Sequence, residues 1–168
     1  MQQKIPTHYL WSFIRKESAF QPHVVSKAHA LGLMQLLKKT AQSLSKLPKA
    51  PLGENFNLFK AHDNIQLASF YLNKLSQRYH KQLPLIAAAY NAGPKALNTW
   101  IKQSNKHGFT RLDYFVELIP FKEARAYVKR LQASACIYRL LYNKESINQC
   151  AQQLPWSLSL EIQSGVDF

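Results

Sequence analysis

The sequence contains little of several residue types that commonly define a protein class. Of its 168 residues, nine are acidic and two are cysteine. Cys136 and Cys150 are too few for a disulfide framework and lack metal-site spacing, so they form either one disulfide or two thiols. The six histidines never pair at the His-Glu-x-x-His spacing, and neither a calcium loop nor a glycine-rich phosphate loop occurs. We therefore predict a protein with no metal and no cofactor.

Long hydrophobic runs are also missing. No apolar stretch reaches the ~20 residues that a bilayer span requires, and the first residues lack the apolar core of a signal peptide. We predict no transmembrane segment. A chain of 168 residues suits one domain over residues 1–168 that buries roughly two thirds of its unfolded surface. Its core should span about residues 5–142, followed by a tail over about residues 143–168.

Because acidic residues are scarce, the charge balance is strongly basic. The 22 lysines and arginines give a formal net charge of +13. Such a charge predicts attraction to polyanions without identifying which one. The basic residues are scattered, and neither zinc-finger spacing nor an aromatic RNA-binding signature occurs. We expect no nucleic-acid partner, since a polymer that carries carboxylates accounts for the charge equally well.

Apolar residues recur at helical intervals along most of the chain. This pattern predicts an all-α (mainly α) fold with little or no sheet. A helix that is hydrophobic nearly all round should be buried, and one such segment lies in the middle of the chain. The main expected segments are a helix from an N-cap at Thr7 to about Phe20, a structured loop over Pro22–Leu37, a helix capped by Asp63, the buried helix Leu85–Tyr90, and a long helix Phe121–Tyr142 with Arg139 solvated.

One carboxylate continues an apolar helical face. Glu17 lies three and four residues after Ile14 and Phe13, and Pro22 should end the helix soon afterwards. A carboxylate among apolar side chains loses hydration, which disfavours its charged form and raises its pKa. It can then hold a proton near neutral pH and act as a general acid. The alternative is a surface residue at a fraying helix end.

Three blocks of sequence around and after Glu17 closely resemble the soluble lytic transglycosylase catalytic (SLT) domain, a relative of goose-type lysozyme. They occur in the order found in that family and span about residues 5–142. The resemblance implies a lysozyme-like helical domain with a substrate groove. The blocks are Glu-Ser-Ala-Phe-Gln-Pro at 17–22 with Ser26 and Gly-Leu-Met-Gln at 32–35, Ala-Ala-Ala-Tyr-Asn-Ala-Gly-Pro at 87–94, and Phe-Val-Glu-Leu-Ile-Pro-Phe at 115–121 with Tyr-Val at 127–128.

The resemblance implies a peptidoglycan lytic transglycosylase, an enzyme without a cofactor. Ordinary glycosidases use two carboxyl groups, whereas one strong candidate exists here. In the implied reaction, Glu17 protonates the β-1,4 glycosidic oxygen between N-acetylmuramic acid and N-acetylglucosamine. Glu17 then takes the proton of the muramyl 6-hydroxyl, which attacks the anomeric carbon and gives a 1,6-anhydromuramyl product. One residue thus acts first as acid and then as base.

The resemblance also implies several substrate-binding residues. The residue types alone leave two roles open for most of them. Gln35 either binds a sugar or braces its loop, Tyr90 is either a sugar hydrogen bonder or a core aromatic with a wet tip, and Glu117 either contacts a sugar or pairs with Arg125 or a helix N-terminus. The implied substrate-binding set is Ser26, Met34 as a packing wall, Gln35, Tyr90, Asn91 and Glu117.

The sequence departs from the family pattern at several positions. His29 stands where a glycine is usual in the loop after Ser26. A side chain at this position either reshapes the groove or requires another backbone angle. The other departures are Leu37-Lys38 in place of Met-Pro, Lys95 in place of a common glycine, and Ala124 in place of a threonine.

Two alternative functions fit the same sequence. One is a lysozyme-type muramidase that hydrolyses the bond, and the other is a non-catalytic peptidoglycan-binding module of a wall-remodelling or secretion assembly. In each case the expected partner is the peptidoglycan glycan strand. The family acts outside the cytoplasm, so we expect a periplasmic or cell-envelope location. Because the chain shows no export signal, we expect it to be part of a larger chain with accessory regions.

Overall fold

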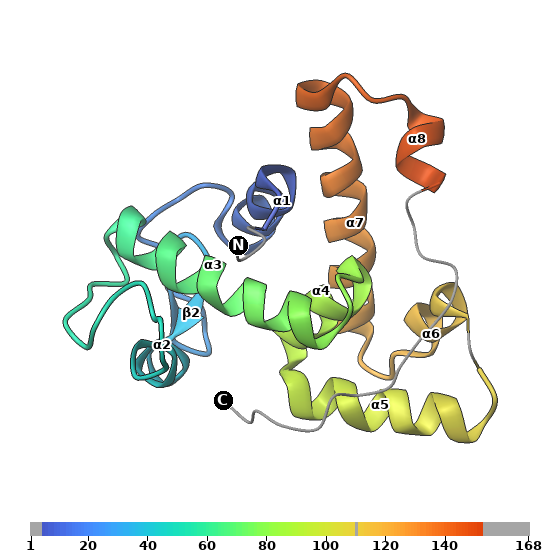
Figure 1. Ribbon diagram of the computed structural model, residues 1–168, viewed down its shortest axis with the longest axis horizontal. Coiled ribbons are helices and arrows are strands. Elements are labelled where there is room, and N and C mark those ends of the chain that lie inside the picture. Colours follow the sequence, from blue (N-terminus) through green and yellow to red (C-terminus); the bar gives the residue numbers. More distant parts are fainter. Residues whose placement is uncertain (1–4, 110, 153–168) are drawn as a thin grey trace. The chain divides into compact units, whose positions relative to one another are not determined.

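A computed structural model describes residues 5–109 and 111–152 (Figure 1). These residues form eight helices and two strands of two residues each. The predicted mainly helical fold with little sheet is therefore confirmed. The described residues fall into two compact units, 5–74 and 75–152.

The first unit begins with α1 (Thr7–Ser18), which ends because Ala19 and Phe20 both take left-handed backbone angles, with φ of 49° and 66°. The predicted end at Phe20 was therefore wrong by two residues. Pro6, not Thr7, occupies the N-cap position, because its carbonyl accepts the first helical hydrogen bonds from the N–H groups of Tyr9 and Leu10.

A small hairpin, helix α2 and the part of helix α3 up to residue 74 complete the first unit. Strand β1 (Ala30–Leu31) pairs antiparallel with β2 (Leu36–Leu37), so the predicted structured loop contains a short hairpin. Helix α2 (Lys38–Ser45) follows β2 directly. Helix α3 (Ala61–Arg78) begins two residues before Asp63, so the predicted cap at Asp63 was wrong. Asp63 Oδ2 instead accepts a hydrogen bond from the backbone N–H of Asn57 at 2.9 Å, in the connector before the helix.

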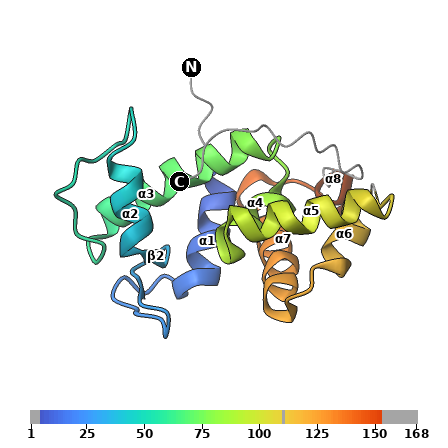
Figure 2. The same cartoon turned by 90° about the horizontal axis from the view of Figure 1, so that it is seen from below.

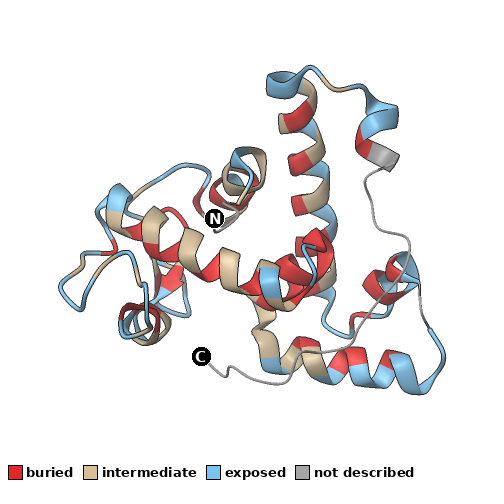
Figure 3. Cartoon of the chain, viewed as in Figure 1, coloured by how far each residue is buried: buried red, intermediate tan, exposed pale blue. Residues whose placement is uncertain are grey.

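The second unit is built around α4 (Leu83–Ala92). Residues 83–89 of this helix are all buried, which confirms the predicted buried helix (Figure 3). Helix α4 packs against α7 (Lys122–Asn143), and the two lie side by side in both views (Figures 1 and 2). It also packs against α5 (Pro94–Lys106), which starts directly after Gly93, a residue with φ of 85°.

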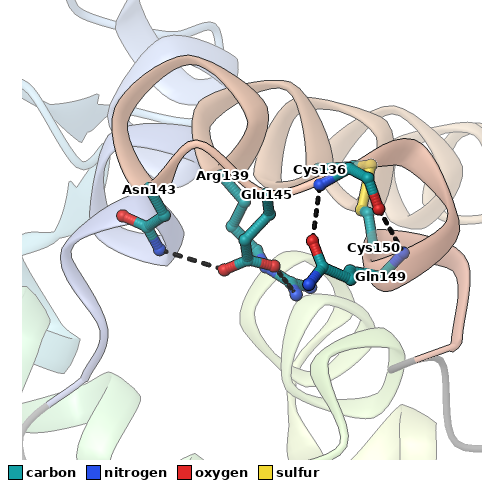
Figure 4. Close-up of a disulfide and its surroundings, with 7 residues drawn as sticks. Cys136, Arg139, Asn143, Glu145, Gln149 and Cys150 are labelled. Carbon is teal, nitrogen blue, oxygen red and sulfur yellow. Dashed lines mark hydrogen bonds and ion pairs between the residues drawn. A yellow bond between two sulfur atoms is a disulfide. The ribbon is translucent and has the colours of Figure 1, made fainter.

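Helix α7 is held to two short neighbours. It contacts α6 (Leu112–Leu118) and α8 (Ile147–Gln152). Cys136 of α7 and Cys150 of α8 form a disulfide, which decides between the two states left open by the sequence (Figure 4). The part of the predicted tail from residue 153 lies outside the described residues.

Beside the disulfide, Arg139 of α7 forms an ion pair with Glu145 (Figure 4). Arg139 is 5% exposed, so the prediction that it is solvated was wrong. A guanidinium leaves water when a carboxylate supplies the charge and hydrogen bonds that water otherwise provides. The partner carboxylate lies in the connection to α8, a helix within the region that the sequence predicted only as a tail over about residues 143–168.

Among the described helices, none combines the length and the apolar character that crossing a membrane requires.

Candidate functional site

Glu17 is the second-last residue of α1 and is half-buried. The face that precedes it is closed to solvent, because Phe13 and Ile14 are 1% and 4% exposed. Ser18, which ends the helix, is also buried and donates its hydroxyl to the Ile14 carbonyl at 3.2 Å. The carboxylate therefore lies at the edge of a buried apolar surface, where the chain leaves the helix.

Ser26 closes a tight turn that precedes β1. Its Oγ accepts a hydrogen bond from the Ala30 N–H at 3.0 Å, and its own N–H donates to the Ala30 carbonyl at 3.0 Å. The Ser26 carbonyl accepts from the His29 N–H at 2.9 Å. Because a hydroxyl that accepts one hydrogen bond still has its own O–H to donate, this bracing is compatible with the predicted substrate contact.

His29 adopts the conformation that a glycine would take without strain. Its φ is 60°, in the left-handed region, and its side chain is exposed. The departure from the family pattern at this position has therefore kept a glycine-like backbone angle and added a side chain to it.

Gln35 braces its own loop. Its Nε2 donates to the carbonyls of Val24 and Gly32, at 3.0 Å and 2.9 Å, and its backbone N–H donates to Gly32 at 3.1 Å. These contacts use the donors of the side-chain amide, and Oε1 is the atom through which Gln35 can accept from a sugar hydroxyl or N-acetyl group. The bracing role that the sequence left open is thus present, and a substrate contact is compatible with it.

Met34 precedes Gln35 in the same turn. It is fully buried, and its backbone N–H donates to Oδ1 of Asn64 on α3 at 2.8 Å. Substrate contact by Met34 stays a prediction.

In the second unit, the buried helix α4 becomes exposed to solvent at its last turn. Tyr90 is half-buried and Asn91 is exposed, although the preceding residues 83–89 are buried. The helix ends there because Gly93 takes a positive φ and Pro94 begins α5. Tyr90 is thus carried at the end of a helix whose preceding residues 83–89 are buried.

Glu117 lies in the last turn of α6 and is exposed. Its Oε1 is 2.5 Å from Nζ of Lys129 on α7, and Nη1 of Arg125 donates to its backbone carbonyl at 2.7 Å. The pairing alternative was therefore right in kind, but the carboxylate pairs with Lys129 rather than Arg125. Since exposed ion pairs contribute about 0–1 kcal/mol, this one can be exchanged for another contact at low cost.

The structure joins three of the predicted residues, all of them in the first unit. Ser26, Met34 and Gln35 belong to one hydrogen-bonded loop system in the first unit. Sequence reasoning missed Asn64, which holds this loop system from α3. A signal for it existed, because Asn64 is a polar residue three and seven positions before the inward residues Leu67 and Tyr71.

Within 5–109 and 111–152, no three His, Cys, Asp or Glu side chains are grouped so that they could hold a metal ion.

Comparison with known proteins supports the sequence resemblance. Residues 1–112 match a family model described as the transglycosylase SLT domain. The soluble lytic murein transglycosylase of Escherichia coli is 36% identical over 138 residues, which cover 82% of this chain and 21% of that protein.

Solved structures agree with the sequence match. A 70-kDa soluble lytic transglycosylase in complex with bulgecin A has a TM-score of 0.75 and 35% identity, covering 82% of this chain and 22% of that chain. An inactive glutamate-to-glutamine mutant of a lytic transglycosylase from Pseudomonas aeruginosa has a TM-score of 0.75 and 32% identity, covering 84% of this chain and 23% of that chain. The chain thus spans about a fifth of the length of these relatives.

Proposed function

Because this chain belongs to the transglycosylase SLT domain family, we propose that it is a lytic transglycosylase domain that cleaves peptidoglycan glycan strands. The bond cleaved is the β-1,4 linkage between N-acetylmuramic acid and N-acetylglucosamine, and the product carries a 1,6-anhydromuramyl end. The observation that carries this proposal is the half-buried Glu17 at the end of a helix whose adjoining face, Phe13 and Ile14, is closed to solvent.

Glu17 is proposed as the one catalytic carboxyl group. It protonates the glycosidic oxygen as the bond to the anomeric carbon breaks, while the 2-acetamido oxygen of the substrate stabilises that carbon. The carboxylate then removes the proton of the muramyl 6-hydroxyl, whose oxygen forms the new bond to the anomeric carbon. The inactive glutamate-to-glutamine mutant of the Pseudomonas aeruginosa relative supports a glutamate in this role.

The remaining residues are proposed to hold the sugar. Gln35 Oε1 accepts from a sugar hydroxyl or amide, the Ser26 hydroxyl donates, and Met34 supports the loop from behind. The Tyr90 hydroxyl, Asn91 and Glu117 supply further hydrogen bonds. Glu117 releases Lys129 when it engages the substrate, because their ion pair is exposed to water.

A location in the cell envelope follows from the substrate and is supported by the disulfide. The Cys136–Cys150 bond persists in oxidising compartments, whereas reducing cytosol keeps thiols reduced. The net charge of +13 suits an anionic wall polymer whose stem peptides carry carboxylates. We propose that the chain acts in the periplasm as part of a longer protein.

The substitution Glu17→Gln tests this proposal. It removes the acidic proton of the carboxyl group and keeps the size of the side chain, so the rate of muropeptide release from purified sacculi should fall by about 10²- to 10⁴-fold. Circular dichroism should be unchanged. Glu54→Gln is the matched control in the same unit, since Glu54 is exposed in the connector before α3 and should leave the rate unchanged. Full activity of Glu17→Gln would refute the assignment.

Mass spectrometry of the released muropeptides separates the alternatives. Products lighter by one water than reducing muropeptides identify the anhydro reaction, whereas reducing muramic ends identify a hydrolase. Sedimentation with sacculi without any released product identifies a binding module.

A further inference from the structure

We propose that Asn64 is a positioning residue, which sets the place of Gln35 by holding the backbone of the turn at residues 32–35. This inference rests on the proposed function, in which Gln35 contacts the sugar. Asn64 itself lies on α3 and is not proposed to touch the substrate.

Both the Nδ2 and the Oδ1 atom of the Asn64 side-chain amide form hydrogen bonds to backbone groups. Its Nδ2 donates to the carbonyl of Leu31 at 2.8 Å and to that of Leu58 at 2.9 Å, and its Oδ1 accepts from the Met34 N–H at 2.8 Å. The residue is 0% exposed. Buried polar groups of this kind are costly to leave unpaired, so the hydrogen bonds to Leu31 and Met34 hold residues 31–34 in one place, and the third ties the same amide to Leu58.

Gly32 shows how closely the turn is held against this amide. A Cβ atom added at Gly32 would lie 2.5 Å from Nδ2 of Asn64 and 2.2 Å from the carbonyl oxygen of Leu58. The φ of Gly32 is 73°, which glycine adopts without strain. The backbone of the turn therefore approaches the amide as closely as sterics allow.

Gly32 is hydrogen-bonded directly to Gln35, so the position of one residue determines that of the other. The Gly32 carbonyl accepts from the backbone N–H of Gln35 at 3.1 Å and from its Nε2 at 2.9 Å. A shift of the turn on Asn64 therefore moves Gln35 at both its backbone and its side chain. Geometry within about 0.5 Å of the productive arrangement is what a binding or catalytic group requires.

The chemistry calls for an amide at this position. The contacts need two donors and one acceptor on one short side chain, which asparagine supplies. A carboxylate of the same shape keeps the acceptor for Met34 and turns the donors into an acceptor that faces the carbonyls of Leu31 and Leu58. Asn64→Asp is therefore the variant that disturbs the turn with the smallest change of volume.

The first experiment compares Asn64→Asp with the wild-type protein in the affinity for bulgecin A and in kcat/KM on purified sacculi. Both should fall by about tenfold or more. The loss of buried hydrogen bonds lowers the free energy that holds the turn in place, and about 1.4 kcal/mol of such a loss corresponds to a tenfold change in affinity or kcat/KM. Asn73→Asp places the same charge on the same helix and should stay within about twofold of wild type. Leu72→Ala lowers stability at a fully buried position eight residues further along α3, so at a temperature where it is folded it should keep its affinity.

A double-mutant cycle separates positioning from a general loss of stability. If Asn64 acts through Gln35, Asn64→Asp should reduce kcat/KM by less than about twofold when Gln35 is already alanine. Its effect on the melting temperature should persist in that background. Losses in kcat/KM that multiply independently would overturn the proposal.

A second measurement uses the wild-type protein, so it does not depend on the folding of any variant. On titration with bulgecin A, the side-chain amide resonances of Asn64 should shift together with those of Gln35, with Asn73 as the reference. Unchanged Asn64 resonances would overturn the proposal. A wild-type protein that does not cleave sacculi refutes the proposed function, whereas an active wild type with an equally active Asn64→Asp refutes this inference alone.

Discussion

Several single residues of this chain adopt backbone angles that glycine usually takes. In the 26–37 region these are His29 and Gln35, with φ of 60° and 47°. The left-handed conformation costs an L-residue roughly 1–2 kcal/mol. Gln35 offsets this cost with the three hydrogen bonds that fasten it to Val24 and Gly32. His29 has an exposed side chain, so the strain there can be measured by substitution.

We predict that His29→Gly raises the free energy of unfolding by about 0.5–1 kcal/mol. Glycine removes the strain at positive φ, and its greater freedom in the unfolded chain reduces the gain. Urea denaturation measures the change. Ala30→Gly, one residue away in β1, is the control and should lower stability, because Ala30 has ordinary strand geometry and is buried. Destabilisation by His29→Gly would show that the histidine side chain makes a favourable contact.

Tyr79 links the end of α3 to α5 and should make the protein sensitive to alkali. It is 1% exposed, and its hydroxyl donates to Asn98 Oδ1 at 3.1 Å. Burial raises the pKa of Tyr79 to about 12, from an ordinary value of 10.0. Because the folded state keeps the proton longer than the unfolded state does, stability is complete below about pH 10 and falls as the pH rises towards about 12.

Melting temperatures measured across this range check the prediction. Tyr79→Phe loses the hydrogen bond to Asn98 and should be less stable by about 1 kcal/mol at neutral pH. Its stability should then fall less steeply than that of wild type above about pH 10. Parallel curves for the two proteins would assign the alkaline loss to other groups.

At the scale of elements, α8 is the clearest case of a helix that depends on its contacts. It has six residues, and isolated helices this short do not persist in water. It is held by the Cys136–Cys150 disulfide and, through the preceding connection, by the ion pair of the buried Arg139 with the partly exposed Glu145. Helix α7, in contrast, has 22 residues and packs against α4 and α6.

We predict that replacing both cysteines with serine lowers the free energy of unfolding by about 3 kcal/mol, because the bond closes a loop with a sequence separation of 14. Amide hydrogen exchange in α8 should accelerate most, and cleavage of sacculi should be unchanged. Dithiothreitol should reproduce the effect in wild type and have none in the double variant. A loss of cleavage activity would show that the disulfide-linked part of α7 and α8 contributes to the proposed site.

Elements with a complete signal in the sequence were predicted well. Helix α4 is hydrophobic nearly all round, so its burial could be predicted, although it runs two residues further at each end (Leu83–Ala92) than the predicted Leu85–Tyr90. The start of α3 was misplaced, because Asp63 resembles a cap and instead binds the connector at Asn57. The end of α1 was misplaced as well, since the left-handed angles of Ala19 and Phe20 come from the turn that follows them rather than from their own preferences.

At the scale of the whole molecule, the helical class and the family were predicted from the sequence alone and are confirmed, whereas the roles of the candidate residues from Glu17 to Glu117 stay predictions. Apolar periodicity and short motifs are local properties, and local residue types are what a sequence records directly. The carboxylate on the buried face of α1 belongs to this group, because helical spacing places Glu17 beside Phe13 and Ile14 whatever the rest of the chain does.

Only the tertiary structure decided which groups meet across long stretches of chain. The Asn64 amide meets a turn about 30 residues earlier, Lys129 rather than Arg125 meets the Glu117 carboxylate, and Arg139 is buried because Glu145 returns to it. Each outcome depends on the path of the backbone between the partners. Hydrogen bonds and ion pairs form over about 3 Å, so they are determined by the folded path rather than by sequence separation.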